Sequence, residues 1–380
     1  MRATVLRDPA LVKMAGRFVW LEIDTEKEGN AGFLEKFPIE VWPTFLVIDP
    51  ATEKPVLKWL GTATAADLSG LLADGERAVK GGAGESADAL LARADRENAA
   101  GRGAEAIALW EKALVAGGPS WPRRARTLES VVAGLQSAGQ PRRCAEVALA
   151  EAPGMARGQS FANVVSMGLS CATGTDEPWG KEAAAKLEPL AVEAVKLPDV
   201  LADDRAGLFD GLVTAREKAG DEKGARARAE EEWSFLVAER AAGKTPEART
   251  MLDSWIVGAA MDLHDPARAI PLLLESEKVA PTDYNPPYRL AMLYLEVKRT
   301  DEALAASDRA LPLAYGPRKI RVLAQRATIL EAKGDLPGAR KALEAAIAHA
   351  GTLPKAQQNA RLAKRLEERL KKMPAGGGAP

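Results

Sequence analysis

The sequence contains few of the residues that bind metals or form covalent crosslinks. It has two cysteines, Cys144 and Cys171, and two histidines, His264 and His349, in 380 residues. A structural zinc site usually takes four Cys or His ligands, so this count nearly excludes one. It also excludes a disulfide scaffold. The phosphate-binding patterns GxGxxG and GxxxxGK[ST] are absent as well, and we expect no metal and no cofactor.

Long hydrophobic runs and an excess of one charge are also missing. No apolar run approaches the roughly 18 residues of a membrane span, and Met1 to Phe18 contains no signal-peptide core. The 52 Lys and Arg residues balance 53 Asp and Glu residues, whereas a dedicated nucleic-acid binder needs a basic surplus. We therefore predict neither nucleic acid nor a membrane span. The default compartment is the cytoplasm, and a signal peptide encoded upstream would change it to the periplasm.

The residues that are present indicate a soluble, folded protein. Hydrophobic residues make up 47% and charged residues 28% of the chain, which is typical of that class. The length suggests two or three domains, or one domain and a repeat array. Composition divides the chain into a strand-containing segment (1–80), a Gly/Ser/Ala linker (81–87), helical repeats (88–353), a capping helix (354–373) and a disordered tail (374–380).

The first segment is predicted to alternate between helices and strands. Runs rich in β-branched and aromatic residues indicate strands at Phe18–Asp24, Pro43–Asp49 and Pro55–Gly61. Helices are expected at Asp8–Ala15, at Asn30–Phe37 and at Thr64–Val79, where Thr64 is the expected N-cap. The order is helix, strand, helix, strand, hairpin, strand, helix.

This order resembles the thioredoxin fold, and three residues carry the resemblance. Pro43 in FPIEVWPT matches the cis-proline of that family, Asp24 closes a strand, and Gly61 precedes the last helix. The resemblance covers about 80 residues, and its motif is moderately specific. It implies a cis peptide bond before Pro43 and a peptide-binding edge formed by Trp42, Pro43 and Thr44. The alternative interpretation of Trp42-Pro43 is an ordinary strand entry.

The family's redox chemistry needs a Cys-x-x-Cys motif at a helix start, and no cysteine precedes Cys144. The family's first strand is also missing, although it would lie between two strands predicted here. Each buried backbone group without a partner costs about 1–3 kcal/mol. We therefore expect that the start is truncated and that strand and dithiol lie upstream of Met1. The alternative is a degenerate domain that has lost the chemistry.

The second segment contains an internal repeat that resembles the tetratricopeptide (TPR) family. The clearest copy is Tyr288–Leu311, and the small residues Ala269, Ala303 and Ala339 recur at about the 34-residue period of that family. Helices approach closely where the contacts lack bulk. The residues predicted to pack between helices are Ala106, Ala113, Ala291, Tyr294, Ala303, Ala310, Ala327, Ala339 and Ala346.

Several predicted turns share a glycine followed five residues later by a small residue. These pairs are Gly101/Ala106, Gly139/Cys144, Gly220/Ala225 and Gly334/Ala339, and the glycine suits a left-handed helix end. Residues 152–200 fit the period least well and are predicted to form a divergent helical pair with a loop at Thr173–Gly180. The repeat count within 120–250 stays open.

Other candidate sites have weaker support. Cys144 stands at a small-residue repeat position, which favours packing over catalysis. Cys171 could be a reactive thiol, and a Cys144–Cys171 disulfide needs a distance that the sequence does not give. His264 is predicted in a turn, and His349 near a helix end. The last helix carries leucines at four-residue spacing and many basic residues; we interpret it as a polar cap rather than as a membrane or nucleic-acid patch.

Two function classes remain. The first is a non-catalytic scaffold whose repeats bind a protein or peptide, with a second contact surface at the thioredoxin-like edge. The alternative is a thiol–disulfide oxidoreductase whose Cys-x-x-Cys lies upstream of Met1. For the chain as written we predict no redox turnover. The partner's identity and the oligomeric state do not follow from the sequence.

Overall fold

The computed structural model describes residues 5–14, 16–80 and 84–374. Contacts within the chain divide it into two compact units. The first unit contains Met1–Phe18 and Val41–Glu239, and the second contains Val19–Glu40 and Arg240–Pro380. The chain therefore contributes to the second unit near its start, returns to the first, and enters the second again within helix α11 (Glu222–Ala242).

A two-stranded antiparallel sheet lies in the N-terminal part of the first unit. β1 (Thr44–Asp49) pairs with β2 (Lys54–Leu60) in a register that sets Phe45 opposite Trp59, and α3 (Ala65–Lys80) follows. Thr64 begins α3 as predicted, since its Oγ1 accepts a 3.1 Å hydrogen bond from the backbone N of Asp67. Leu57, Leu68 and Leu71 form the core between hairpin and helix.

The predicted strand at Phe18–Asp24 is wrong. Beyond Phe18 the run has no strand geometry, and Val19 and Leu21 are 88% and 72% exposed. Strand-forming composition expresses a fit to a half-buried pleated surface, and no neighbouring strand supplies one to this segment. The short 3-10 helix η2 (Glu28–Asn30) and α2 (Ala31–Lys36) follow, which confirms the predicted second helix.

The first predicted helix is shorter than expected. α1 covers Pro9–Val12 and begins at Asp8, whose Oδ1 accepts a 2.8 Å hydrogen bond from the backbone N of Ala10. Residue 15, the predicted end of this helix, lies outside the described residues. Of the predicted linker, Ser86 caps α4 and Ala87 is already helical.

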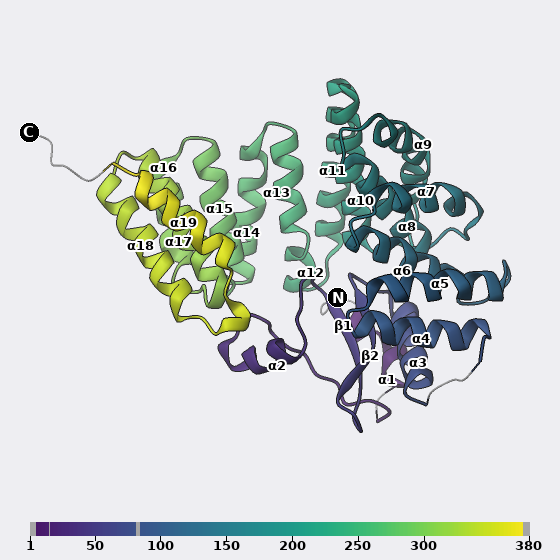
Figure 1. Ribbon diagram of the computed structural model, residues 1–380. Helices are drawn as coiled ribbons and strands as arrows, with labels where there is room; N and C mark the ends of the chain where they lie inside the picture. The colour runs from purple at the N-terminus through teal and green to yellow at the C-terminus, as the bar shows by residue number, and fades with distance from the viewer. Residues whose placement is uncertain (1–4, 15, 81–83, 375–380) are drawn as a thin grey trace, which may run out of the picture. The chain divides into compact units, whose positions relative to one another are not determined.

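From Ala87 onward the chain consists mostly of helical pairs, as the repeat prediction expected (Figure 1). The pairs of the first unit are α4 (Ala87–Ala99) with α5 (Gly103–Gly117), α6 (Arg124–Ser137) with α7 (Pro141–Glu151), α8 (Gln159–Thr173) with α9 (Pro178–Ala194), and α10 (Ala202–Ala219) with α11. Those of the second are α13 (Asp253–Asp262) with α14 (Ile270–Val279), α15 (Asn285–Glu296) with α16 (Thr300–Ala310), and α17 (Gly316–Ala332) with α18 (Leu336–Thr352).

Two short elements connect pairs: the 3-10 helix η3 (Ala152–Gly154) lies between α7 and α8, and the short helix α12 (Pro246–Thr250) lies between α11 and α13. The 3-10 helix η4 (Pro266–Ala269) lies within a pair, between α13 and α14, and η1 (Val5–Arg7) precedes α1. The divergent pair predicted within residues 152–200 corresponds to α8 and α9, whose connection lies at the predicted loop.

Except for the connection of α8 to α9, where Gly174 has φ −70°, the turns between paired helices share one geometry. A left-handed residue ends the first helix, and the next backbone N–H donates to the carbonyl five residues before it, which is the Schellman pattern. This residue is Gly101, Gly139, Gly220, His264, Lys298 or Gly334, with φ between 55° and 79°. His264 and Lys298 hold the position without being glycine. Both precede a buried small residue, Ala269 or Ala303, by five residues, as the glycines precede Ala106, Cys144, Ala225 and Ala339.

Small residues lie where helices approach one another. Ala106, Ala113, Ala291, Ala303, Ala310, Ala327, Ala339 and Ala346 are fully buried, and Tyr294 is 7% exposed. Gly168 on α8 shows how tight such a contact is, because a Cβ there would lie 2.4 Å from Cβ of Ala148 on α7. Close packing of the helices at this interface therefore requires residues with small side chains.

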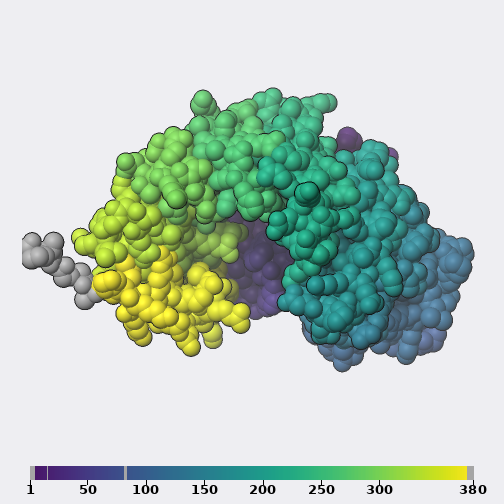
Figure 2. All heavy atoms as spheres, turned by 90° about the horizontal axis from the view of Figure 1, so that it is seen from above, coloured from purple at the N-terminus to yellow at the C-terminus, as the bar shows by residue number. Residues whose placement is uncertain are grey.

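The predicted capping helix at 354–373 is interrupted. Residues Lys355–Gln357 form the 3-10 helix η5, and α19 covers Ala360–Lys372. The break occurs because Asn359 adopts an extended conformation and its Oδ1 accepts a 2.9 Å hydrogen bond from the backbone N of Leu362. Leu366 packs against α17 and α18, and Figure 2 shows α19, in yellow, continuous with these helices. Most of the tail, residues 375–380, lies outside the described residues.

Candidate functional site

The first helices of the N-terminal repeats pack against the strand-containing segment. Asn98 on α4 donates to the carbonyl of Lys58 on β2 (3.2 Å), and Arg96 donates to the carbonyl of Ala78 on α3 (3.1 Å). Val56, Ala78 and Ala92 form an apolar cluster across the same contact. The hairpin and α3 therefore pack together with the helical repeats of the first unit.

An ion-pair network strengthens this contact. Arg126 on α6 binds Asp95 on α4 through two hydrogen bonds of 3.0 and 2.8 Å and stands 5.9 Å from the ring of Trp59. Arg123 donates to Asp74 on α3 at 3.0 Å. Since these groups neutralise each other and are largely covered, we assign them a structural role.

A buried chain of polar side chains links four elements of the first unit. Thr62 donates to Asp204 on α10 (2.6 Å), Gln159 on α8 donates to the same carboxylate (2.6 Å), and Asn163 donates to Oε1 of Glu129 on α6 (2.6 Å). Burial raises the pKa of Glu129 to about 8 and that of Asp204 to about 6. Glu129 has no cationic partner in this network, so it is protonated at neutral pH.

In the second unit, the repeats hold an acidic turn from near the chain's start. The turn is Asp24–Lys27, in which the backbone N of Lys27 donates to the carbonyl of Asp24 at 3.3 Å. The hydroxyl of Tyr315 donates to Oδ2 of Asp24 at 2.7 Å, and the guanidinium of Arg318 pairs with the carboxylate of Glu26. The hydrogen bond to Asp24 raises the pKa of Tyr315 to about 12. We call Tyr315, Gly316, Arg318 and Gln357 the acidic-turn site.

Backbone contacts fix the same turn. Gln357 of η5 donates from Nε2 to the carbonyls of Thr25 (2.9 Å) and Lys27 (3.0 Å), and its side chain is 7% exposed. Gly316 leaves room for the turn, since a Cβ there would lie 2.2 Å from the carbonyl oxygen of Glu26. Its φ of +51° also favours glycine.

A polar pocket of about 490 Å³ lies beside this turn. It is lined by Glu26, Asn285, Arg289, Tyr315 and Arg318, among others. Arg289 is half-buried on α15, and within the described part of the chain it has no ion-pair partner. Asp283 also lines the pocket, and the charge of Arg289 acts on the buried Asp253, so the pocket beside the bound turn carries charges of both signs.

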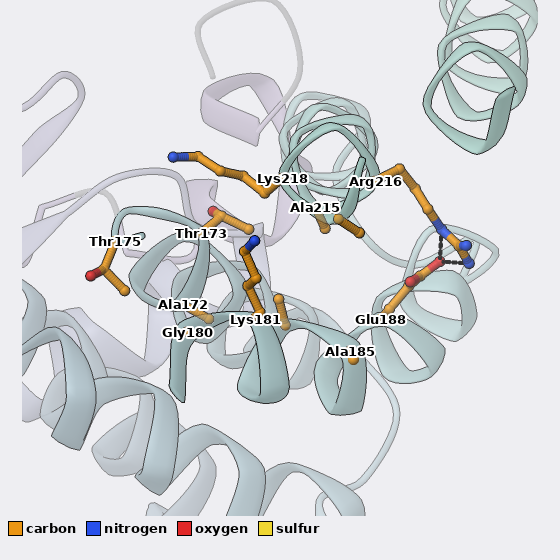
Figure 3. A pocket seen from close by; sticks show the side chains of 12 residues that line it. Ala172, Thr173, Thr175, Gly180, Lys181, Ala185, Glu188, Ala215, Arg216 and Lys218 are labelled. Atoms are coloured by element: carbon orange, nitrogen blue, oxygen red, sulfur yellow. Dashed lines mark hydrogen bonds and ion pairs between the residues drawn. The ribbon is translucent and has the colours of Figure 1, made fainter. Parts of the chain in front are cut away.

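A second pocket, of about 180 Å³, lies between α8, α9 and α10 (Figure 3). Alanines 172, 184, 185, 215 and 219 line much of it. Arg216 at its edge donates to Glu188 at 2.7 Å, and Lys218 pairs with Asp176 at 2.5 Å. With most charges neutralised and an alanine lining, it presents little chemistry for recognising a ligand.

The predicted peptide-binding edge lies at the start of β1. The Trp42–Pro43 peptide bond is cis. Trp42 is 58% exposed, and the hydroxyl of Thr44 donates to the carbonyl of Val41 at 2.6 Å. In the sheet of the described residues, β1 pairs with β2 on one side.

The remaining candidates have structural positions. Cys144 on α7 and Cys171 on α8 form a disulfide with their Cα atoms 6.3 Å apart, so the pairing that the sequence left open joins two adjacent repeats. His264 lies in a turn, as predicted, and adopts the left-handed conformation there. Nε2 of His349 lies 3.0 Å from the carbonyl oxygen of Gly316. Over the described ranges, no group of three or more His, Cys, Asp and Glu side chains is arranged to hold a metal.

Sequence reasoning missed the acidic-turn site and the buried carboxyl chain. Their members come from segments up to 332 residues apart, and no spacing rule connects Gln357 with Thr25. One signal was present for the turn, namely acidic residues at positions 22, 24, 26 and 28. Among described helices, none is long and apolar enough to cross a membrane.

Comparison with known proteins finds similarity only among solved structures. No family model matches the chain, and no curated protein matches it either. A tetratricopeptide repeat protein from Parabacteroides merdae aligns at 11% identity and TM-score 0.49, over 76% of this chain and 100% of that one. The TPR2AB domain of yeast Sti1, in its pHSP90 complex, aligns at 17% identity and TM-score 0.30, over 75% and 98%.

The assembly chaperone of RpL4 (Acl4) aligns at 15% identity and TM-score 0.36, over 75% of this chain and 97% of that one. These scores and identities are too low to carry an argument about partner or chemistry. The repeat fold of this chain therefore rests on its own helical pairs and turns.

Proposed function

We propose that the chain is a non-catalytic scaffold whose helical repeats bind a peptide segment of another protein. One observation carries the proposal: the second unit already holds a peptide turn, Asp24–Lys27, through side chains of α17 and η5. Contacts to two backbone carbonyls and two carboxylates are those expected of a peptide-recognition surface.

Peptide selection on the purified full chain tests this proposal. A random-peptide phage library should yield sequences enriched over a bare-support control. The enriched peptides should bind with dissociation constants on the order of micromolar, and hydrogen exchange should show protection within the repeats. Absence of any enriched peptide, or protection confined to residues outside the repeats, would contradict the proposal.

A second candidate surface is the edge of β1 at Trp42, Pro43 and Thr44. The order β1, β2, Gly61 with positive φ, then α3 supports the finer proposal of a thioredoxin-like segment. A strand with one paired side offers its other row of backbone groups to an extended peptide. Replacing Thr44 by Pro removes one backbone donor and should weaken peptides bound here, but not those bound at the repeats.

The redox alternative makes a different prediction for this chain. A thiol–disulfide oxidoreductase needs a thiolate that attacks the substrate disulfide, and Cys144 and Cys171 are bonded to each other. We therefore expect no insulin-disulfide reduction above the rate with dithiothreitol alone. Turnover that disappears in a Cys144→Ala/Cys171→Ala variant would instead support an oxidoreductase.

A further inference from the structure

The acidic-turn site contacts carboxylates and backbone carbonyls, which many acidic turns present. Tyr315 and Arg318 contact the carboxylates of Asp24 and Glu26, which are two residues apart. Gln357 contacts two backbone carbonyls. These bonds go to two carboxylates and two backbone carbonyls, groups that other Asp-x-Glu turns also present.

The pocket beside the site holds a second arginine, Arg289, which forms no ion pair in the described part of the chain. Asp283 lines the same pocket, and the charge of Arg289 acts on Asp253, so little net positive charge is left there. The charge complementarity of the site lies instead in Tyr315 and Arg318, which contact the two carboxylates of the turn. It indicates an acidic protein loop as the ligand.

The resident turn is held by contacts of mixed exposure. Tyr315 is 43% and the Arg318 side chain 32% exposed, whereas Gln357 is 7% exposed. The turn also has a high local concentration, since it belongs to the same chain. An external acidic turn in sufficient excess therefore competes with it for the same contacts.

We infer that the acidic-turn site is a docking site for an acidic turn of a partner protein, and that Asp24–Lys27 occupies it in the absence of that partner. The inference rests on the proposed function, because it names where a peptide binds and which chemistry it has. It also adds regulation: an internal segment lowers the apparent affinity for the partner by the fraction of time that the site is occupied.

A labelled peptide of residues 21–31 tests this competition by fluorescence anisotropy on the full chain. The variant Asp24→Asn/Glu26→Gln weakens the resident turn and leaves the site intact. It should bind the peptide at least about tenfold more tightly than the wild type does. Adding Arg318→Gln to this variant should weaken peptide binding by about tenfold or more, because it removes a charge-assisted hydrogen bond to the peptide.

Matched controls separate charge from folding. Arg309→Gln breaks the Arg309–Glu277 ion pair of the same unit, outside the site, and should leave peptide affinity unchanged. A peptide carrying Asn and Gln in place of Asp24 and Glu26 should not bind. Circular dichroism checks that each variant is folded.

Equal affinity of the wild type and the Asp24→Asn/Glu26→Gln variant would overturn the internal competition. No binding of the peptide to that folded variant at millimolar concentration would overturn the docking site. If phage-selected peptides still bind the chain in that case, the scaffold function stands and only this inference fails.

Discussion

Glu129 provides the most direct test of the buried polar chain in the first unit. Its side chain is buried, accepts a 2.6 Å hydrogen bond from Asn163, and has a pKa of about 8. In the unfolded chain, the pKa of this group is near its ordinary value of 4.5. Because the folded state binds the proton more tightly, its stability is highest below pH 4.5 and is lost as the pH rises through 8.

The size of the effect follows from the shift. A pKa difference of one unit corresponds to about 1.36 kcal/mol, so the rise from 4.5 to about 8 sets an upper limit of roughly 5 kcal/mol. Glu129→Gln keeps an oxygen that accepts from Asn163 and removes the ionisation. The variant should match the wild type near pH 5 and become progressively more stable than it up to pH 8 to 9.

Urea unfolding followed by circular dichroism at each pH measures this difference, and hydrogen exchange of α6 and α8 locates it. Asp204 titrates in both proteins, and its electrostatic effect on Glu129 is the smallest of the causes of the raised pKa, so most of its contribution cancels in the comparison. Glu111→Gln, which alters an exposed ion pair with Arg143, serves as the control and should show little pH dependence. A stability difference between Glu129→Gln and wild type that stays constant from pH 5 to pH 9 would refute the reasoning.

Three further predictions concern the repeats, each measured as a change in unfolding free energy. Lys298→Gly should stabilise the second unit by about 1 kcal/mol, because the left-handed conformation at φ 60° strains a side-chain residue; a loss of stability would contradict this. Gly168→Ala should cost about 1–3 kcal/mol, because its Cβ would overlap Ala148. The control Gly258→Ala, with open space at its Cβ, should not be destabilising. Arg240→Met should cost about 3–5 kcal/mol by leaving Asp253 buried without its 2.6 Å partner, and a cost near zero would show that Asp253 is neutral.

The helical array could be predicted because its signals are local. Apolar residues at helical spacing and glycines at positions 101, 139, 220 and 334 mark helices and their left-handed ends. His264 and Lys298 escaped the glycine pattern because a residue with a side chain holds the left-handed position there. The strand predicted at Phe18–Asp24 failed because composition cannot show whether a neighbouring strand exists.

The sites depend on tertiary proximity, which this sequence encodes weakly. Thr62 meets Asp204 across 142 residues, and Gln357 meets Thr25 across 332. A glutamate on a helix face, such as Glu129, looks like a solvated residue until the covering segment is known. The Cys144–Cys171 disulfide likewise could not be predicted, because the sequence does not give the distance between α7 and α8.

The position of the acidic turn affects how the protein is made. Asp24 leaves the ribosome early, yet its partner Tyr315 follows 291 residues later. At synthesis rates of about 5–20 residues per second, the turn waits roughly 15–60 seconds for its binding site. During that interval the first unit can fold around the residues on both sides of the segment, which leaves the turn as a free loop. The loop can reach its contacts only after the C-terminal repeats emerge.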